Sequence, residues 1–194
     1  GVLERVYSCV AGQNTHISDE VGVFVGIQHF EYGVIQGSLG PFSATGVALS
    51  ACSGRVSYVF GYNGPSLSVD TACSASLTSV HLALYDYSAS RAYICGGVNY
   101  MLGRTNFDAV RIAGMLACDG RCKTLDSTAD GYGRGEAVAC LLFSHDEVAS
   151  SFVVFASACG QDGRSTSLTA PNGPAQRRVV CQAWFTVEHF VVDI

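Results

Sequence analysis

The chain has 194 residues, of which 48% are hydrophobic and 14% are charged, and its formal net charge is −5 at pH 7. This length predicts one compact unit, and we find no linker, internal repeat or low-complexity segment in it. Nucleic-acid binders usually carry a basic excess, whereas the densest basic spot here is Arg177-Arg178, so nucleic-acid binding is not expected. No apolar run approaches the ~18 residues of a membrane-spanning helix, so no membrane span is expected.

The nine cysteines do not indicate a disulfide framework, because their number is odd and most of them lie in apolar or small-residue runs. Cys118 and Cys122 form the one close pair, and no second pair or nearby histidine completes a zinc site. This usage of cysteine favours a reducing, intracellular setting, and we expect a cytoplasmic protein.

Helical patterns alternate with apolar, β-branched runs of strand length. In chain order the predicted elements are a helix at 3–12, a strand at 21–27, a helix at 43–61 that Ser43 could cap, a strand at 65–72, a helix at 73–90, a strand at 92–102, an irregular stretch at 104–136, two adjacent strands at 137–145 and 151–159, a polar loop from 161 and a last helix at 175–188. This alternation predicts an α/β fold with helices layered on a central sheet whose strands are buried on both faces.

The stretch VDTACSAS, residues 69–76, places a thiol where a predicted strand turns into a predicted helix. The first N–H groups of a helix lack intrahelical partners and its dipole is positive there, which favours a thiolate and can hold an oxyanion. Small neighbours leave room for a substrate. Cys73 is therefore the candidate nucleophile, and the alternative is a buried structural cysteine.

DTACSAS followed by LTSVHLAL resembles the active-site motif of β-ketoacyl synthases, the ketosynthase domains of fatty-acid and polyketide synthases. The resemblance extends in order along nearly the whole chain and is closest to the type I polyketide synthases. The similar segments are VGVFVGI at 21–27, ACSGRVSYVFGYNGPSLSVDTACSAS at 51–76, ICGGVN at 94–99, GMLACDGRCKTLDSTADGYGRGEA at 114–137 and GQDGRSTSLTAPNGPAQ at 160–176.

The resemblance implies a thiolase-like fold of two α/β halves in an αβαβα sandwich, of which residues 1–194 would be mainly the N-terminal half. It implies that Cys73 takes an acyl group from an acyl carrier protein, and that a malonyl-type extender then decarboxylates and attacks the acyl-cysteine. It implies no metal and no organic cofactor, since the phosphopantetheine arm belongs to the carrier protein. It also implies a homodimer of the full domain.

The sequence departs from the family in its histidines. The family places one in a His-Gly-Thr-Gly-Thr motif and one in an Asn-Ile-Gly-His motif, and neither motif is present in these 194 residues. We expect the chain to be a piece of a larger ketosynthase domain that can be acylated but elongates poorly. The five histidines present are His16, His29, His81, His145 and His189. His81 should face away from Cys73 on the same helix, and His29 is more readily a loop residue than a catalytic partner.

Several polar residues near these motifs are interpreted as structural. Asp70 is expected to bond backbone amides of the turn rather than to act as an acid or base. Asp130, Arg134 and Glu136 are expected to form a structural ion pair, because they carry opposite charges in one glycine-rich loop. A nucleotide site is not expected there, because the loop lacks the preceding strand and following helix of a dinucleotide-binding loop. Gly96-Gly97 is expected to let the Cys73 helix approach the strand closely.

Two other functions remain open at this point. One is a non-elongating relative, such as a decarboxylase or a structural dimer partner. The other is a thiolase or chalcone-synthase type of enzyme that acts on coenzyme A esters.

Overall fold

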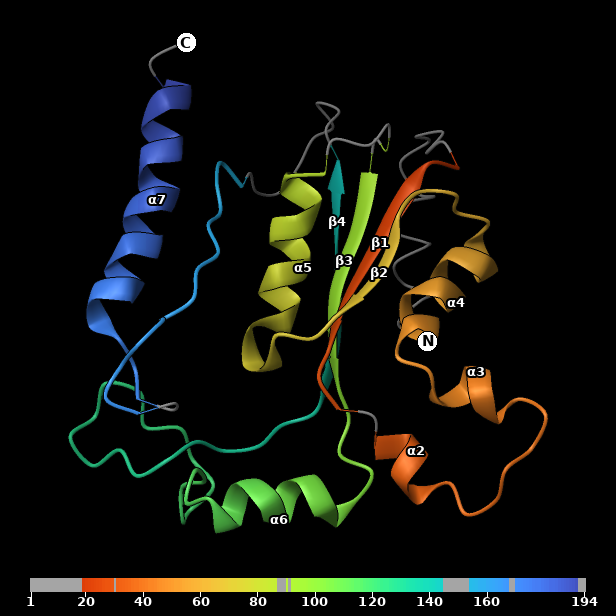
Figure 1. Ribbon diagram of the computed structural model, residues 1–194, viewed down its shortest axis with the longest axis horizontal. Coiled ribbons are helices and arrows are strands. Elements are labelled where there is room, and N and C mark those ends of the chain that lie inside the picture. The colour runs from red at the N-terminus through yellow and green to blue at the C-terminus, as the bar shows by residue number, and fades with distance from the viewer. Residues whose placement is uncertain are drawn as a thin grey trace.

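The computed structural model describes residues 19–29, 31–86, 90, 92–144, 154–167 and 170–191, with side chains described as far as residue 185. The helix predicted at 3–12 lies outside these residues. A four-stranded sheet forms the centre of the described chain, with the strand order β2-β1-β3-β4 (Figure 1). None of the helices in these ranges is both long and apolar enough to cross a membrane.

The sheet is mixed. The central strand β1 (Val21–Ile27) pairs in parallel with β2 (Ser66–Val69) on one side and with β3 (Ala92–Asn99) on the other. The last strand, β4 (Ala137–Ser144), pairs antiparallel with β3. Burial on both faces is confirmed for β1 and for most of β3. It is wrong for β2, which has no buried residue, and for β4, most of whose residues are exposed.

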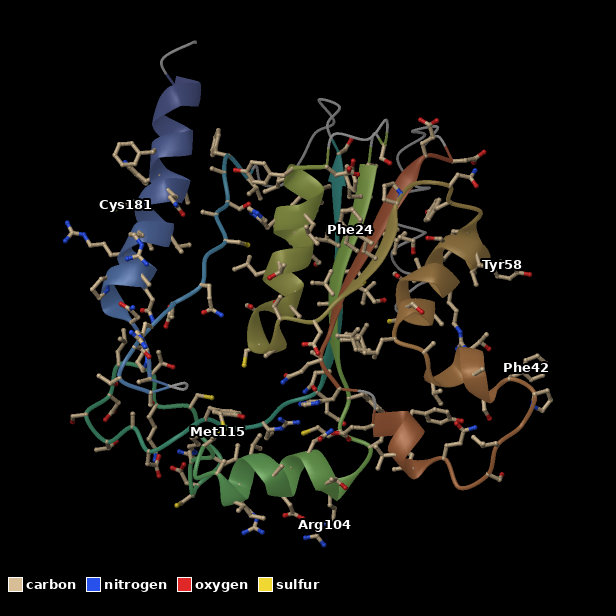
Figure 2. The ribbon with its side chains drawn as sticks, in the orientation of Figure 1. Phe24, Phe42, Tyr58, Arg104, Met115 and Cys181 are labelled. Carbon is tan, nitrogen blue, oxygen red and sulfur yellow. The ribbon has the colours of Figure 1, made fainter. Side chains whose placement is uncertain are left out.

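One helix covers each face of the two central strands (Figure 1). Helix α5 (Ala75–Leu84) packs on one face, where Phe24 and Tyr93 are each 1% exposed and their ring centroids lie 5.6 Å apart. In Figure 2 the labelled Phe24 lies between the strands and this helix. Helix α4 (Ser50–Phe60) covers the opposite face. The alternation of side chains along β1 thus supplies both halves of the core.

The helix predicted at 43–61 is two helices. Helix α3 (Ser43–Val47) is followed by Ala48, whose backbone is extended with φ −76° and ψ 124°. Helix α4 then begins at Ser50. The prediction that Ser43 caps this region is wrong, since Phe42 holds the N-cap position. The Ser43 hydroxyl instead accepts hydrogen bonds from Gln36 Nε2 and from the backbone N–H of Gly40, both at 2.7 Å.

Two helices lie outside the helices that the sequence predicted. Helix α2 (Glu31–Ile35) follows β1, and helix α6 (Arg104–Ile112) lies within the stretch predicted to be irregular. No residue of α6 is buried, and Gly103 supplies its N-cap without a side-chain hydrogen bond. A helix with so little core contact depends on partners outside itself, and Glu31 is one of them.

The C-terminal part contains one confirmed and one wrong prediction. Residues 154–159, the described part of the strand predicted at 151–159, form no strand. Helix α7 (Gly173–Val191) is confirmed, and Figure 1 shows it standing apart from the sheet. Its first turn is held by Asn172, whose Oδ1 accepts a hydrogen bond from the N–H of Ala175 at 3.2 Å.

Candidate active site

Cys73 lies in a tight turn between β2 and α5. The strand ends at Val69, residues Ala72–Ser74 form one 3₁₀ turn (η1), and α5 begins at Ala75. The thiol of Cys73 is exposed. The junction that the sequence predicted is therefore present, and the alternative of a buried structural cysteine is wrong for this residue.

The turn is held in an unusual backbone conformation. Ala72 has φ 54°, in the left-handed region that costs an L-residue about 1–2 kcal/mol. Such strain persists only where neighbouring interactions fix it. The carboxylate of Asp70 supplies one, since its Oδ1 accepts the N–H of Ala72 at 2.9 Å. The prediction that Asp70 bonds the amides of the turn is confirmed.

A chain of three hydroxyl groups brackets Cys73. Ser74 Oγ donates to the carbonyl oxygen of Thr71 and to Thr71 Oγ1, both at 2.9 Å. Thr71 Oγ1 in turn is hydrogen-bonded to Thr78 Oγ1 at 2.9 Å. These contacts join the residues on both sides of Cys73 to the second turn of α5. The sequence alone does not predict these hydrogen bonds, because nothing in the spacing of Thr71 and Thr78 indicates them.

Glycines bring the Cys73 helix close to the sheet. A Cβ atom on Gly97 would lie 2.6 Å from the Cβ of Ser76, which confirms the predicted close approach for this glycine. Gly96 faces the other way, and a Cβ there would meet Cys140 Sγ at 2.7 Å. The missing side chain of Gly26 makes room for the backbone of Ala75. The position of the helix is therefore set by glycines on two strands.

The backbone N–H of Cys73 is not used by the hydrogen bonds of the turn. The N–H of Ala72 is bonded to Asp70, that of Ser74 to the carbonyl of Thr71 at 3.3 Å, and that of Ala75 to the carbonyl of Ala72. Among the described residues the Cys73 N–H has no hydrogen-bond partner, and a backbone N–H of this kind can receive the oxygen of an attacked carbonyl.

In the described residues no histidine is hydrogen-bonded to the thiol of Cys73. His81 Nδ1 is hydrogen-bonded to Ser157 Oγ at 2.8 Å, and its ring lies 4.7 Å from that of Tyr85. His29 follows β1, which ends at the same sheet edge as β2, but no hydrogen bond joins it to Cys73 in the described part of the chain. The predictions for His16, His145 and the side chain of His189 fall outside the described residues.

The glycine-rich loop after α6 is held by charges other than those predicted. Asp130 pairs with Lys123 at 2.7 Å and accepts the N–H of Cys118 at 3.4 Å. Glu136 instead accepts the N–H of Met101 at 2.7 Å. An ion pair of Asp130 or Glu136 with Arg134 is therefore a wrong prediction, because each carboxylate has another partner, and Arg134 Nε lies 3.4 Å from Met101 Sδ.

Burial distinguishes three other thiols, those of Cys52, Cys95 and Cys140, from the exposed Cys73. Burial raises the pKa of the Cys95 thiol to about 12, and the neighbouring Cys140 adds to the shift. Burial likewise raises the pKa of Cys52 and of Cys140. Because the thiolate is the nucleophile, these three are poor candidates at neutral pH.

The family model of the β-ketoacyl synthase N-terminal domain matches residues 9–149. The chain is 36% identical to the polyketide synthase component of lovastatin nonaketide synthase from Aspergillus terreus, over 92% of this chain and 6% of that protein. It is 42% identical to the polyketide synthase GfsA from Streptomyces halstedii, over 85% of this chain and 2% of that protein. The chain thus spans only a small part of these relatives.

Solved structures agree with these sequence matches. The ketosynthase from module 6 of the bacillaene synthase of Bacillus subtilis superposes with a TM-score of 0.78 and 29% identity, over 87% of this chain and 30% of that one. The oxazolomycin ketosynthase domain OzmH KS7 of Streptomyces albus superposes with a TM-score of 0.81 and 26% identity, over 96% of this chain and 35% of that one. The α/β fold is therefore thiolase-like, and the chain belongs to the β-ketoacyl synthase family as a ketosynthase of the polyketide synthase type.

Proposed function

We propose that this chain carries the acyl-accepting nucleophile of a condensing enzyme in polyketide biosynthesis, and that the nucleophile is Cys73. The observation that carries the proposal is the exposed thiol of Cys73 in a strained strand-to-helix turn. That turn lies within the 141 residues, 9 to 149, that the ketosynthase family model matches.

In the first step the Cys73 thiolate attacks the carbonyl carbon of an acyl thioester on an acyl carrier protein. A bond forms between Sγ and the carbonyl carbon, and the thioester C–S bond breaks, so that the carrier leaves as a free thiol after taking up a proton. We assign the N–H of Cys73, which the hydrogen bonds of the turn leave unused, to the oxyanion formed on the way.

In the second step a malonyl-type thioester on the carrier loses CO₂, and the electron pair of the broken C–C bond becomes a carbanion. The carbanion attacks the acyl-Cys73 carbonyl, a new C–C bond forms, and the C–S bond breaks to return the Cys73 thiolate. The product is a β-ketoacyl thioester on the carrier. The proposal assigns only Cys73 to this step, since the described histidines have other surroundings.

The proposed partners are an acyl carrier protein, acyl and malonyl thioesters, and a second copy of the same domain. Strand β2 supports the last of these, because it stands at one end of the described strand order with an unpaired edge, and its Leu67 is 46% exposed. The proposed location is the cytoplasm, in keeping with the eight cysteines of the described residues, all of them free thiols. No resident metal or organic cofactor is assigned to the reaction.

The test uses the intact native polypeptide that carries this sequence. It is incubated with an acyl group on a carrier protein or on coenzyme A, and the peptide containing Cys73 is examined by mass spectrometry for the acyl mass. A malonyl carrier is then added and the β-ketoacyl product measured. Cys73→Ala should abolish both signals, whereas Cys159→Ala, at another exposed thiol, should preserve them.

Comparison of the two acyl donors, carrier protein and coenzyme A, distinguishes the proposed function from the two alternatives. Acylation from the carrier followed by condensation supports the proposal. Acylation only from coenzyme A favours a thiolase-like enzyme, and acylation without condensation favours a non-elongating relative. Acylation that persists in Cys73→Ala would refute the assignment of the nucleophile.

A further inference from the structure

The hydroxyl chain of Thr71, Ser74 and Thr78 has no part in the chemistry derived above. Two of these hydroxyl groups, those of Thr71 and Ser74, lie on either side of Cys73, yet none of the three is hydrogen-bonded to the Cys73 sulfur. We propose that Thr78 is a positioning residue, which holds the Cys73 turn in the geometry for acyl transfer through its hydrogen bond to Thr71. The inference rests on the proposed function only for the expected change in acylation rate; the expected fixing of the turn does not depend on that function.

The first argument is the strain of the turn. Ala72 takes its left-handed conformation between Thr71, with φ −129° and ψ 37°, and the start of α5. The backbone hydrogen bond that closes the turn, from Ser74 N–H to the Thr71 carbonyl, is long at 3.3 Å. A strained turn with one long hydrogen bond needs further fixing, and the side chains of Thr71 and Ser74 provide it.

The second argument is the count of protons. Ser74 has one hydroxyl proton and shares it between two acceptors on Thr71, the carbonyl oxygen and Oγ1. Thr71 Oγ1 then has its own proton for Thr78, or accepts the proton of Thr78. In the first case Thr71 Oγ1 both accepts and donates, and in the second case it accepts twice. In either direction Thr78 is the link between the turn and the regular helix.

The third argument is that Thr78 occupies a fixed point. It is flanked in α5 by Ser79, which is 0% exposed and whose Oγ donates to the carbonyl of Gly96 at 3.2 Å. The same helix is held against β1 by the close approach of Ala75 to Gly26. The sheet thus fixes the position of α5 and, with it, that of Thr78. The hydrogen bonds among the three hydroxyl groups then hold Thr71 and Ser74, on the two sides of Cys73, relative to α5.

The test compares Thr78→Val, which removes the hydroxyl with little change in volume, with Thr78→Ser, which keeps it. Thr105→Val, at an exposed position of α6, is the matched control. In the intact polypeptide, Thr78→Val should slow acylation of Cys73 at saturating donor about five-fold, the factor expected for one hydrogen bond of typical net strength. The donor concentration for half-maximal rate and the pH midpoint of Cys73 alkylation by iodoacetamide should not change, and Thr78→Ser should restore the rate.

Hydrogen exchange makes the test independent of the reaction. Thr78→Val should speed exchange of the amides of Ala72, Ser74 and Ala75, which are hydrogen-bonded in the turn, about five-fold. Neither Thr78→Ser nor Thr105→Val should do so. If the wild-type protein forms no acyl-Cys73, the proposed function fails, and exchange alone decides on the positioning role. Unchanged exchange and acylation in Thr78→Val would overturn the inference, as would an equal defect in Thr78→Ser or a shifted alkylation midpoint.

Discussion

The backbone N–H of Gly103 donates a hydrogen bond of 2.8 Å to Oε2 of Glu31, although 72 residues separate them in the chain. The other oxygen, Oε1, accepts from Asn106 Nδ2 at 3.1 Å. Glu31 is only 5% exposed, so its carboxylate ties α2 to the first turn of α6 from a buried position. A carboxylate at a helix N-terminus is favoured by the helix dipole, and this one replaces the side-chain cap that Gly103 cannot supply.

Glu31→Gln should destabilise the protein by about 1–3 kcal/mol at pH 7, because it removes the charged acceptor of a buried pair of hydrogen bonds. Urea unfolding followed by circular dichroism measures the change. Glu136→Gln, at an exposed carboxylate, is the control and should cost less. Equal stabilities of the Glu31 variant and the wild type would contradict this role of the carboxylate.

The same carboxylate makes stability depend on pH. Burial acts to raise the pKa of Glu31, but hydrogen bonds from Gly103 and Asn106 and the charge of Arg134 lower it overall below the ordinary value of 4.5. A pKa lowered on folding gives stability that is present above the unfolded pKa and lost as the pH falls through the folded pKa. Below pH 4.5 the wild type should therefore lose its advantage over Glu31→Gln. A difference that stays constant from pH 7 to pH 3 would contradict the shift.

Gly26→Ala should be strongly destabilising. A Cβ at this position would lie 2.4 Å from the backbone carbonyl carbon of Ala75, and a backbone atom of a packed helix cannot turn aside as a side chain can. Overpacking of this kind costs about 3 kcal/mol or more, and it should push the Cys73 turn away from β1. Gly54→Ala is the matched control in α4, where nothing lies within 4 Å, and should stabilise by about 0.5–1 kcal/mol. A tolerated Gly26→Ala would show that α5 can shift.

Alkylation by iodoacetamide should distinguish the cysteines at pH 8. With a pKa of about 12, only about one Cys95 thiol in ten thousand is ionised at that pH, and the side chain is 1% exposed. Cys73 should react at least 100-fold faster than Cys95 when the peptides are compared by mass spectrometry. In 8 M urea the difference should disappear. Comparable rates in the folded protein would mean that β3 opens readily.

Ala72→Gly and Ala72→Val should change stability in opposite directions. Glycine adopts φ 54° without a steric cost, so the relief of strain should exceed the added entropy of the unfolded chain by up to about 1 kcal/mol. Valine is β-branched and should destabilise by more than 1 kcal/mol at this φ. Thermal unfolding of both variants tests the pair, and a more stable valine variant would show that the turn is not left-handed at Ala72.

The two strands that the sequence predicted best are buried. Strands β1 and β3 are continuous apolar runs because both faces are covered. The exposed turn at Cys73 was predicted from a different signal, a strand pattern that runs directly into a helical pattern. Helix α6 was missed because it buries nothing and has no capping side chain of its own; its support comes from Glu31, far away in sequence.

The strand predicted at 151–159 failed for a related reason. The apolar run SFVVFASAC has the composition of a strand, yet in its described part the polar groups bond to α5. Ser157 Oγ meets His81, and the Ser157 carbonyl accepts the hydroxyl of Tyr85 at 2.9 Å. Composition indicates what a segment can form, whereas these partners are set by tertiary packing.

The parallel pairing of β1 with both β2 and β3 also determines when, during synthesis, the Cys73 turn can reach its final position. Cys73 leaves the ribosome before residues 92–99 do, and α5 cannot seat on Gly97 until those residues have paired with β1. A nascent chain that ends between these points holds the thiol without the strand that places its helix. The Cys73 turn therefore reaches the geometry described above only after translation has passed β3.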